Sequence, residues 1–110
     1  MVALLLGLLA IVLTGSQAAL SADEPSLLPQ EPIEQADVRL RRQGWRPVPG
    51  LNPDPFERQL AGNRLASLSA CSGTGMGFCR YDYKRGGKNL GVVTVPGPKA
   101  QGVVQSWTLR

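Results

Sequence analysis

Two cysteines carry the clearest chemistry in this chain. Cys71 and Cys79 enclose the segment Ser-Gly-Thr-Gly-Met-Gly-Phe, and the sequence contains neither a third cysteine nor a histidine. Two thiols alone cannot complete a four-ligand zinc site, whereas in an exported protein such a pair forms a disulfide. We therefore predict that Cys71 and Cys79 are joined by a disulfide that closes a short loop.

The absence of histidine excludes several kinds of site. A Ser-His-Asp triad, a histidine metal site and a histidine pH switch cannot be built from this sequence. No Ser-x-x-Lys sequence supplies another base for the serines near the cysteines. Asp54 with Glu57, or Asp82 alone, does not make a carboxylate pair suited to glycoside hydrolysis. The sequence therefore predicts a protein that is not an enzyme and that uses no metal and no cofactor.

Three glycines alternate inside the cysteine loop, at Gly73, Gly75 and Gly77. They resemble a loop that cradles phosphate, but such a loop follows a strand and opens a helix. This one leads instead into Phe78 and a further predicted strand, and the Gly-Lys pair at Lys88 lacks the Ser or Thr of a P-loop. The glycines therefore favour a tight structural connection, or a recognition loop, over a nucleotide site.

A helix is predicted over residues 32–43. Acidic side chains gather in its first turn and arginines in its last, which complements the helix dipole, and Asp37 is spaced to pair with Arg41. Gly44 is placed to end the helix in a left-handed conformation, with Trp45 folding back onto the last turn. The apolar residues of this segment recur at i, i+3 and i+7: Ile33, Ala36 and Leu40.

The remaining patterns predict a second helix and then a sheet. Residues 45–55 are rich in proline and predict an extended loop, after which Asp54 caps a short helix that ends near Gly62. A period of two then predicts strands over residues 65–72, 78–83, 90–95 and 103–109, with a hairpin turn over 85–88. The predicted fold class is α+β: a helix, a loop and a short helix on one face of an antiparallel meander of about four strands, with one disulfide.

Four large aromatic residues, Trp45, Tyr81, Tyr83 and Trp107, dominate the apolar volume of this small domain. We expect them to pack in the core against the helix. The alternative is that Tyr81 or Tyr83 faces outward beside basic residues and forms a contact surface for a sugar or a protein.

The N-terminal segment differs in composition from the rest of the chain. Residues 1–22 begin with an apolar run that is short for a membrane span and continue with small residues, which predicts a signal peptide cleaved after Ala18, or alternatively after Ala22. Because no base precedes the run, an uncleaved membrane anchor is the other interpretation. Residues 23–31 are predicted to be a flexible acidic N-terminus, and residues 32–110 a single α+β domain in the periplasm or outside the cell.

Charge is distributed unevenly along the chain. All 12 Lys and Arg residues lie from Arg39 onward, whereas most of the 8 acids precede that residue. This basic body favours anionic partners such as an envelope polymer or lipid headgroups, and we do not expect nucleic acid to be the partner. The alternative interpretation is an ordinary solvated surface, partly neutralised by the acidic N-terminal segment.

Several sequence features together resemble a family of short secreted bacterial proteins of unknown function. They are Gly44-Trp45-x-Pro, Cys71-Ser-Gly-Thr-Gly-x-Gly-x-Cys79, a Gly-turn hairpin ending Val-x-Thr-Val, and Val-Val-x-x-Trp107. The predicted order of elements also resembles one unit of the β-lactamase-inhibitor-protein or PepSY-like fold. That second resemblance implies a module that binds another protein, although fold alone does not establish function.

The sequence thus predicts an exported binding domain with an inhibitor-like or adaptor-like role towards another protein. The competing hypothesis is an envelope-associated module whose basic face binds an anionic polymer or lipid surface, and a purely structural role is a third. Loops on a rigid scaffold usually carry binding. The predicted contact surface therefore consists of Gly73, Thr74, Gly75, Met76, Gly77, Phe78, Arg85 and Lys88.

Overall fold

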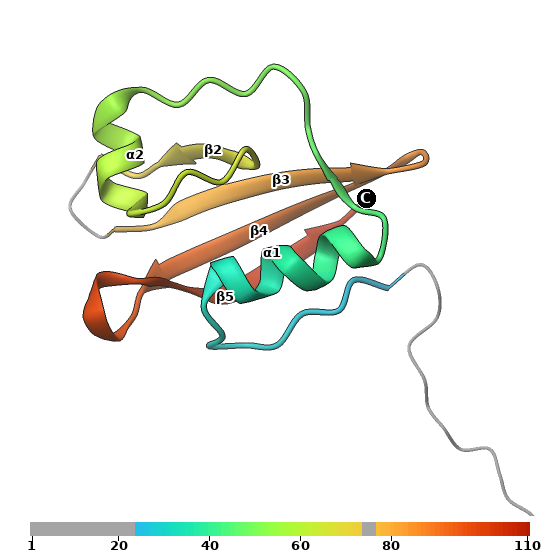
Figure 1. Cartoon of the computed structure of the whole chain (residues 1–110), viewed down its shortest axis with the longest axis horizontal. Helices are drawn as coiled ribbons and strands as arrows, with labels where there is room; N and C mark the ends of the chain where they lie inside the picture. The colour runs from blue at the N-terminus through green and yellow to red at the C-terminus, as the bar shows by residue number, and fades with distance from the viewer. Residues whose placement is uncertain (1–23, 74–76) are drawn as a thin grey trace, which may run out of the picture.

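The computed structural model describes residues 24–73 and 77–110, which fold into two α-helices and a five-stranded antiparallel sheet (Figure 1). The predicted α+β class with one disulfide is confirmed. The predicted signal segment, residues 1–22, lies outside the described residues. In chain order the elements are α1 (Ile33–Arg42), β1 (Arg46–Pro47), α2 (Pro55–Ala61), β2 (Leu68–Cys71), β3 (Cys79–Arg85), β4 (Lys88–Pro96), the 3₁₀ turn η1 (Pro98–Ala100) and β5 (Gly102–Leu109).

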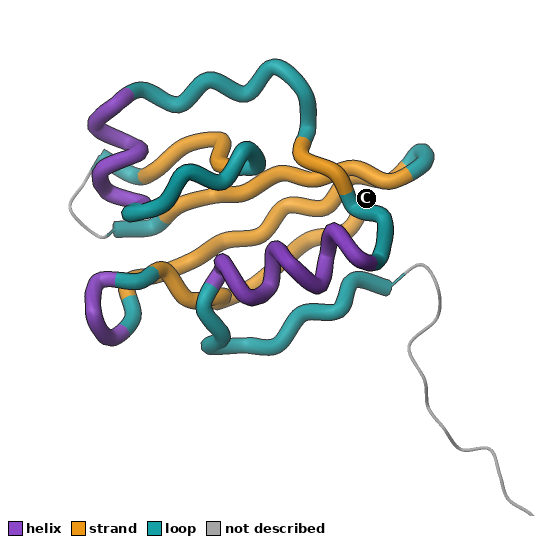
Figure 2. Tube along the Cα trace, viewed as in Figure 1, coloured by secondary structure: helices purple, strands orange, loops and turns teal. Residues whose placement is uncertain are grey.

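β3 is the strand around which the sheet is organised. It pairs with β4 along one side, and on its other side with β2 near Cys79 and with β1 near Lys84 (Figure 2). β5 continues the meander beyond β4. β1 was not predicted, because its two residues lie in the proline-rich loop and are too few to show a period of two. β2 is shorter than the strand predicted over residues 65–72.

The core lies between the sheet and the helices. Alternate residues of β3, namely Cys79, Tyr81 and Tyr83, are buried on the face that α1 covers, as the pattern predicted. α1 contributes its predicted apolar stripe of Ile33, Ala36 and Leu40, and α2 adds Ala61 to the same core.

Trp107 does not belong to this core, so the prediction for it is wrong. It pairs with Val92 and therefore faces the same side of the sheet, yet 36% of its surface is exposed. The reason is its place on β5, the strand at the edge of the sheet, where neighbours cover only part of the indole. Trp45, Tyr81 and Tyr83 are fully buried.

The C-terminus of α1 ends as predicted. Gly44 has a φ of +92°, and its N–H donates to the carbonyl oxygen of Arg41 at 3.0 Å. The N–H of Trp45 donates to the carbonyl oxygen of Leu40, also at 3.0 Å, which completes a Schellman motif. This motif turns the chain so that the Trp45 side chain enters the core.

A capping box begins α2. The Asp54 side chain accepts a hydrogen bond from the Glu57 N–H at 2.8 Å, and Glu57 Oε1 accepts one from the Asp54 N–H at 3.0 Å. The second carboxylate oxygen of Glu57 accepts the N–H of Cys71 at 2.8 Å. The cap of α2 therefore also positions β2 where the disulfide begins.

Residues 24–31, predicted to be a flexible extension, are packed against the domain. Leu27 is buried in the core, and the buried carboxylate of Glu31 pairs with Arg39. Gln30 N–H donates to the carbonyl oxygen of Val104 at 2.7 Å, and Val104 N–H donates to the carbonyl oxygen of Glu31 at 2.8 Å. Composition alone suggested a free acidic segment, but the buried Leu27 side chain and the ion pair between Glu31 and Arg39 of α1 hold it against the domain.

A buried polar link joins α1 to β3. The Tyr83 hydroxyl donates to Asp37 Oδ1 at 2.6 Å, and Arg41 Nε donates to Asp37 Oδ2 at 2.9 Å, so the predicted Asp37–Arg41 pair is confirmed. Burial raises the pKa of Tyr83 above its ordinary value, and the hydrogen bond to Asp37 acts in the same direction. Burial also raises the pKa of Tyr81.

We expect the free energy of unfolding to fall as the pH rises above about 10, the ordinary pKa of tyrosine. Folded Tyr81 and Tyr83 keep their protons there, while the unfolded chain releases them. Their contribution is therefore complete below about pH 10 and is lost above it, at up to about 1.4 kcal/mol per pH unit for each phenol. Urea unfolding between about pH 8 and about pH 11 measures this slope. The Tyr83→Phe variant should show a clearly smaller slope, and equal slopes in both proteins would contradict the assignment.

Candidate basic binding surface

The structure places the predicted contact residues at two opposite ends of β3 (Figure 1). Gly73, Gly77 and Phe78 lie beside the disulfide, whereas Arg85 and Lys88 flank the two-residue turn at the far end of the strand. They do not form one surface. Thr74, Gly75 and Met76 lie outside the described residues.

The predicted disulfide is confirmed. Cys71 and Cys79 are directly opposite each other in the pairing of β2 with β3, and their Cα atoms are 4.0 Å apart. Gly77 has a φ of +73°, and a side chain there would collide with Pro96. Both facts fit a tight connection between two strands, which is the structural interpretation of the glycines.

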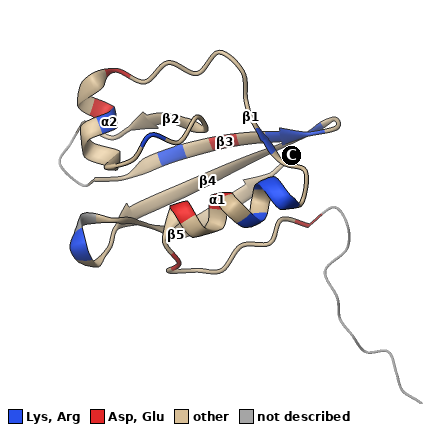
Figure 3. Cartoon of the chain, viewed as in Figure 1, with Lys and Arg blue, Asp and Glu red and all other residues tan. Residues whose placement is uncertain are grey.

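The opposite end of the molecule is rich in positive charge (Figure 3). The last turn of α1, the strand β1 and the β3–β4 hairpin meet there, and each contributes Lys or Arg side chains. We call this region the basic end, and it comprises Arg41, Arg42, Arg46, Lys84, Arg85 and Lys88.

Two pairs of like charges face each other across strands of the basic end. Arg46 is opposite Lys84 in the pairing of β1 with β3, and Arg85 is opposite Lys88 in the hairpin. Like charges directly opposite one another destabilise a sheet. The two pairings concentrate positive charge at this end of the sheet.

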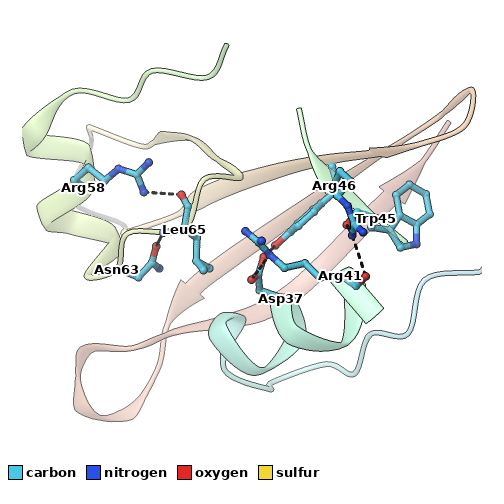
Figure 4. Close-up of polar contacts among 8 residues, drawn as sticks. Asp37, Arg41, Trp45, Arg46, Arg58, Asn63 and Leu65 are labelled. Carbon is cyan, nitrogen blue, oxygen red and sulfur yellow. Dashed lines mark hydrogen bonds and ion pairs between the residues drawn. The ribbon is translucent and has the colours of Figure 1, made fainter. Parts of the chain in front are cut away.

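Two of these arginines also support the fold. Arg46 Nη1 donates to the carbonyl oxygen of Arg41 at 3.0 Å (Figure 4), and Arg85 Nη1 donates to that of Gln43 at 2.9 Å. Positive groups at the C-terminus of a helix interact favourably with its dipole and with its unpaired carbonyls. The Arg85 guanidinium also lies 4.7 Å from the centre of the Trp45 ring, in a cation–π contact.

Three other cations of the basic end remain exposed: Arg42, Lys84 and Lys88. Among the described residues, the ion pairs are those of Arg39 with Glu31, Arg41 with Asp37 and Arg80 with Asp82, so none involves these three side chains. Their charges are thus open to an anion from outside the molecule.

Two arginines outside the basic end, Arg58 and Arg80, are held by internal contacts. Arg80 Nε lies 3.0 and 3.1 Å from the two carboxylate oxygens of Asp82, and its guanidinium lies over Gly91, where any side chain would collide with it. Arg58 donates to the carbonyl oxygen of Leu65 at 2.6 Å (Figure 4). These contacts order the sheet surface and the loop after α2, and they engage the guanidinium groups of Arg58 and Arg80 within the fold.

The fold and this surface define a small α+β domain with a disulfide at one end of its sheet and concentrated positive charge at the other. No protein-family model, curated protein or solved structure matches the chain. Neither α1 nor α2, the helices of the described residues, is long and apolar enough to cross a membrane. Across residues 24–73 and 77–110, no three cysteine, aspartate or glutamate side chains group so as to hold a metal ion.

Proposed function

We propose that this chain is an exported, non-enzymatic binding domain that attaches through its basic end to an anionic envelope surface. The observation that carries the proposal is the exposure of Arg42, Lys84 and Lys88 at the end of the sheet where Arg46 is opposite Lys84 and Arg85 is opposite Lys88. The composition of residues 1–22 and the Cys71–Cys79 disulfide support export.

An extended anionic surface suits these side chains. They come from three elements, α1, β3 and β4, and each is a flexible stem with a charge at its tip. A basic residue held near an anionic membrane contributes about 1 kcal/mol of binding free energy, and the contributions of several residues accumulate. The same chemistry serves for phosphate-bearing lipid headgroups and for an anionic polymer.

A second candidate is the inhibitor-like or adaptor-like role towards another protein. It is favoured by three exposed apolar side chains, Phe56 and Leu60 of α2 and Phe78 beside the disulfide, whose exposed fractions are 58%, 38% and 37%. A partner bound there would be retained at high salt, because an apolar contact is not screened by ions.

Binding to lipid vesicles tests the first proposal. We expect the folded protein to bind vesicles containing about 30% phosphatidylglycerol, to ignore neutral phosphatidylcholine vesicles, and to lose affinity steeply between about 50 and about 200 mM salt. The double variant Lys84→Gln, Lys88→Gln should bind about 30-fold more weakly, since two basic residues contribute about 2 kcal/mol. Co-sedimentation with the vesicles measures both effects.

A matched variant separates the basic end from net charge. Arg64→Gln with Lys99→Gln removes the same charge from exposed positions outside the basic end and should change the affinity less than about threefold. Equal losses in the two double variants would overturn the proposal, as would failure to bind anionic vesicles at low salt. Competition by soluble polyphosphate would distinguish an anionic polymer from the lipid as the preferred ligand.

A further inference from the structure

β5 has an open outer edge over its C-terminal half. Asn89 and Arg110 exchange two backbone hydrogen bonds of 2.8 Å, so the backbone groups of Arg110 point towards β4. Backbone direction alternates along a strand, and the N–H and C=O groups of Leu109 and Trp107 therefore point away from the sheet. Gln30 and Glu31 cover this edge at Val104, but no described backbone group pairs with Trp107 or Leu109 from outside.

This open edge lacks two of the features that usually protect an edge strand, charged residues and proline. The stretch Gln-Ser-Trp-Thr-Leu at residues 105–109 contains no charged residue and no proline. Two large apolar side chains stand on it, Trp107 with 36% and Leu109 with 37% of their surfaces exposed. Both face the α1 side of the sheet, because their partners in β4 are the buried Val92 and Leu90.

We propose that a second copy of this chain pairs with this edge, so that the two β5 strands run antiparallel about a two-fold axis at Thr108. In that register Trp107 lies opposite Leu109 of the partner subunit. By symmetry, Leu109 lies opposite Trp107 of the partner subunit. Each such pair exchanges two hydrogen bonds, and all the outward backbone groups of Trp107 and Leu109 are satisfied. The two sheets become one continuous antiparallel sheet.

The strand is complementary to itself in this register, which is why the occupant is a second copy. Apolar side chains meet apolar side chains twice on the α1 face, and Thr108 meets Thr108 of the partner subunit on the other face. Arg110 falls opposite Ser106, so no like charges face each other. The pairing between the two copies ends at Ser106. The backbone hydrogen bonds of Val104 with Gln30 and Glu31 are therefore unchanged.

Cysteine cross-linking tests the register. Thr108→Cys places the new thiol opposite its copy at a Cα separation of about 4.5 Å, which suits a disulfide, whereas Ser106→Cys on the same face lies about 13 Å from its copy. With Cys71 and Cys79 already joined, the added thiol is the only free one. Mild oxidation should cross-link the first variant almost completely and the second hardly at all, and equal cross-linking would overturn the proposal.

Sedimentation equilibrium of the unmodified chain provides the second test. It should show a concentration-dependent dimer, and Trp107→Lys with Leu109→Lys should raise the dissociation constant at least about tenfold by charging the edge. Phe56→Lys, at an exposed apolar site on α2, should leave the dissociation constant unchanged. A monomer at all concentrations, or a dimer that survives the double lysine variant, would overturn the proposal. Neither test depends on the basic end.

Discussion

Replacing Trp45 by alanine should lower the free energy of unfolding by about 4 kcal/mol, a large share of the net stability of a domain of this size. The indole has no exposed surface and lies where the end of α1, β1 and Arg85 meet. Its removal leaves a cavity and takes away the cation–π contact as well. Urea unfolding followed by circular dichroism measures the loss.

Trp45→Phe is the control for that prediction. It keeps an aromatic ring beneath Arg85. It also removes the buried Trp45 Nε1–H group, which has no hydrogen-bond partner in the part of the chain that the structure describes. The loss should be less than half of that caused by alanine, since the cavity is smaller and the unpaired donor disappears. Equal losses would show that ring packing is not the source of the stability.

Removing the disulfide should have the next largest effect. The loop that it closes has a sequence separation of 8, for which the entropy of loop closure gives about 2.5 kcal/mol. The double variant Cys71→Ser, Cys79→Ser should therefore unfold at a clearly lower temperature. Calorimetry of this variant beside the oxidised and reduced parent protein measures the difference.

The reduced parent is the internal control for the disulfide. It should match the double serine variant, and the variant should not respond to reductant at all. An unchanged melting temperature on reduction would mean that the pairing of β2 with β3, together with the contact from Glu57 to the Cys71 N–H, already holds this end of the sheet.

Sequence predicted the fold best where a structure is set by neighbours along the chain. The glycine that ends α1, the capping box at Asp54 and the turn at Gly86 each depend on a few consecutive residues, and each lies where it was predicted. The exposure of Trp107 and the packing of Leu27 depend instead on which strand forms the edge and on what crosses it. A pattern of neighbouring residues does not show which strand will form the edge of the sheet or which segment will pack across it.

Only part of the basic end could be predicted from the sequence. A two-residue turn places its flanking residues opposite each other, so the Arg85–Lys88 pair was readable from the Gly-Gly turn. The Arg46–Lys84 pair was not, because it requires β1, and β1 exists only through its contact with β3. The predicted joining of Phe78 and Lys88 in one surface failed because β3 holds the two residues at opposite ends.

If the basic end binds an anion as proposed, the like-charge pairs at Arg46–Lys84 and Arg85–Lys88 would couple that binding to folding. Like charges on opposing strand residues repel each other, and a polyanion bound among these groups, as proposed above, would relieve that repulsion. Any ligand that binds the native chain in preference to the unfolded chain stabilises the native chain by mass action. Under the proposed function, the protein would therefore resist denaturation most strongly when it is bound to its anionic surface.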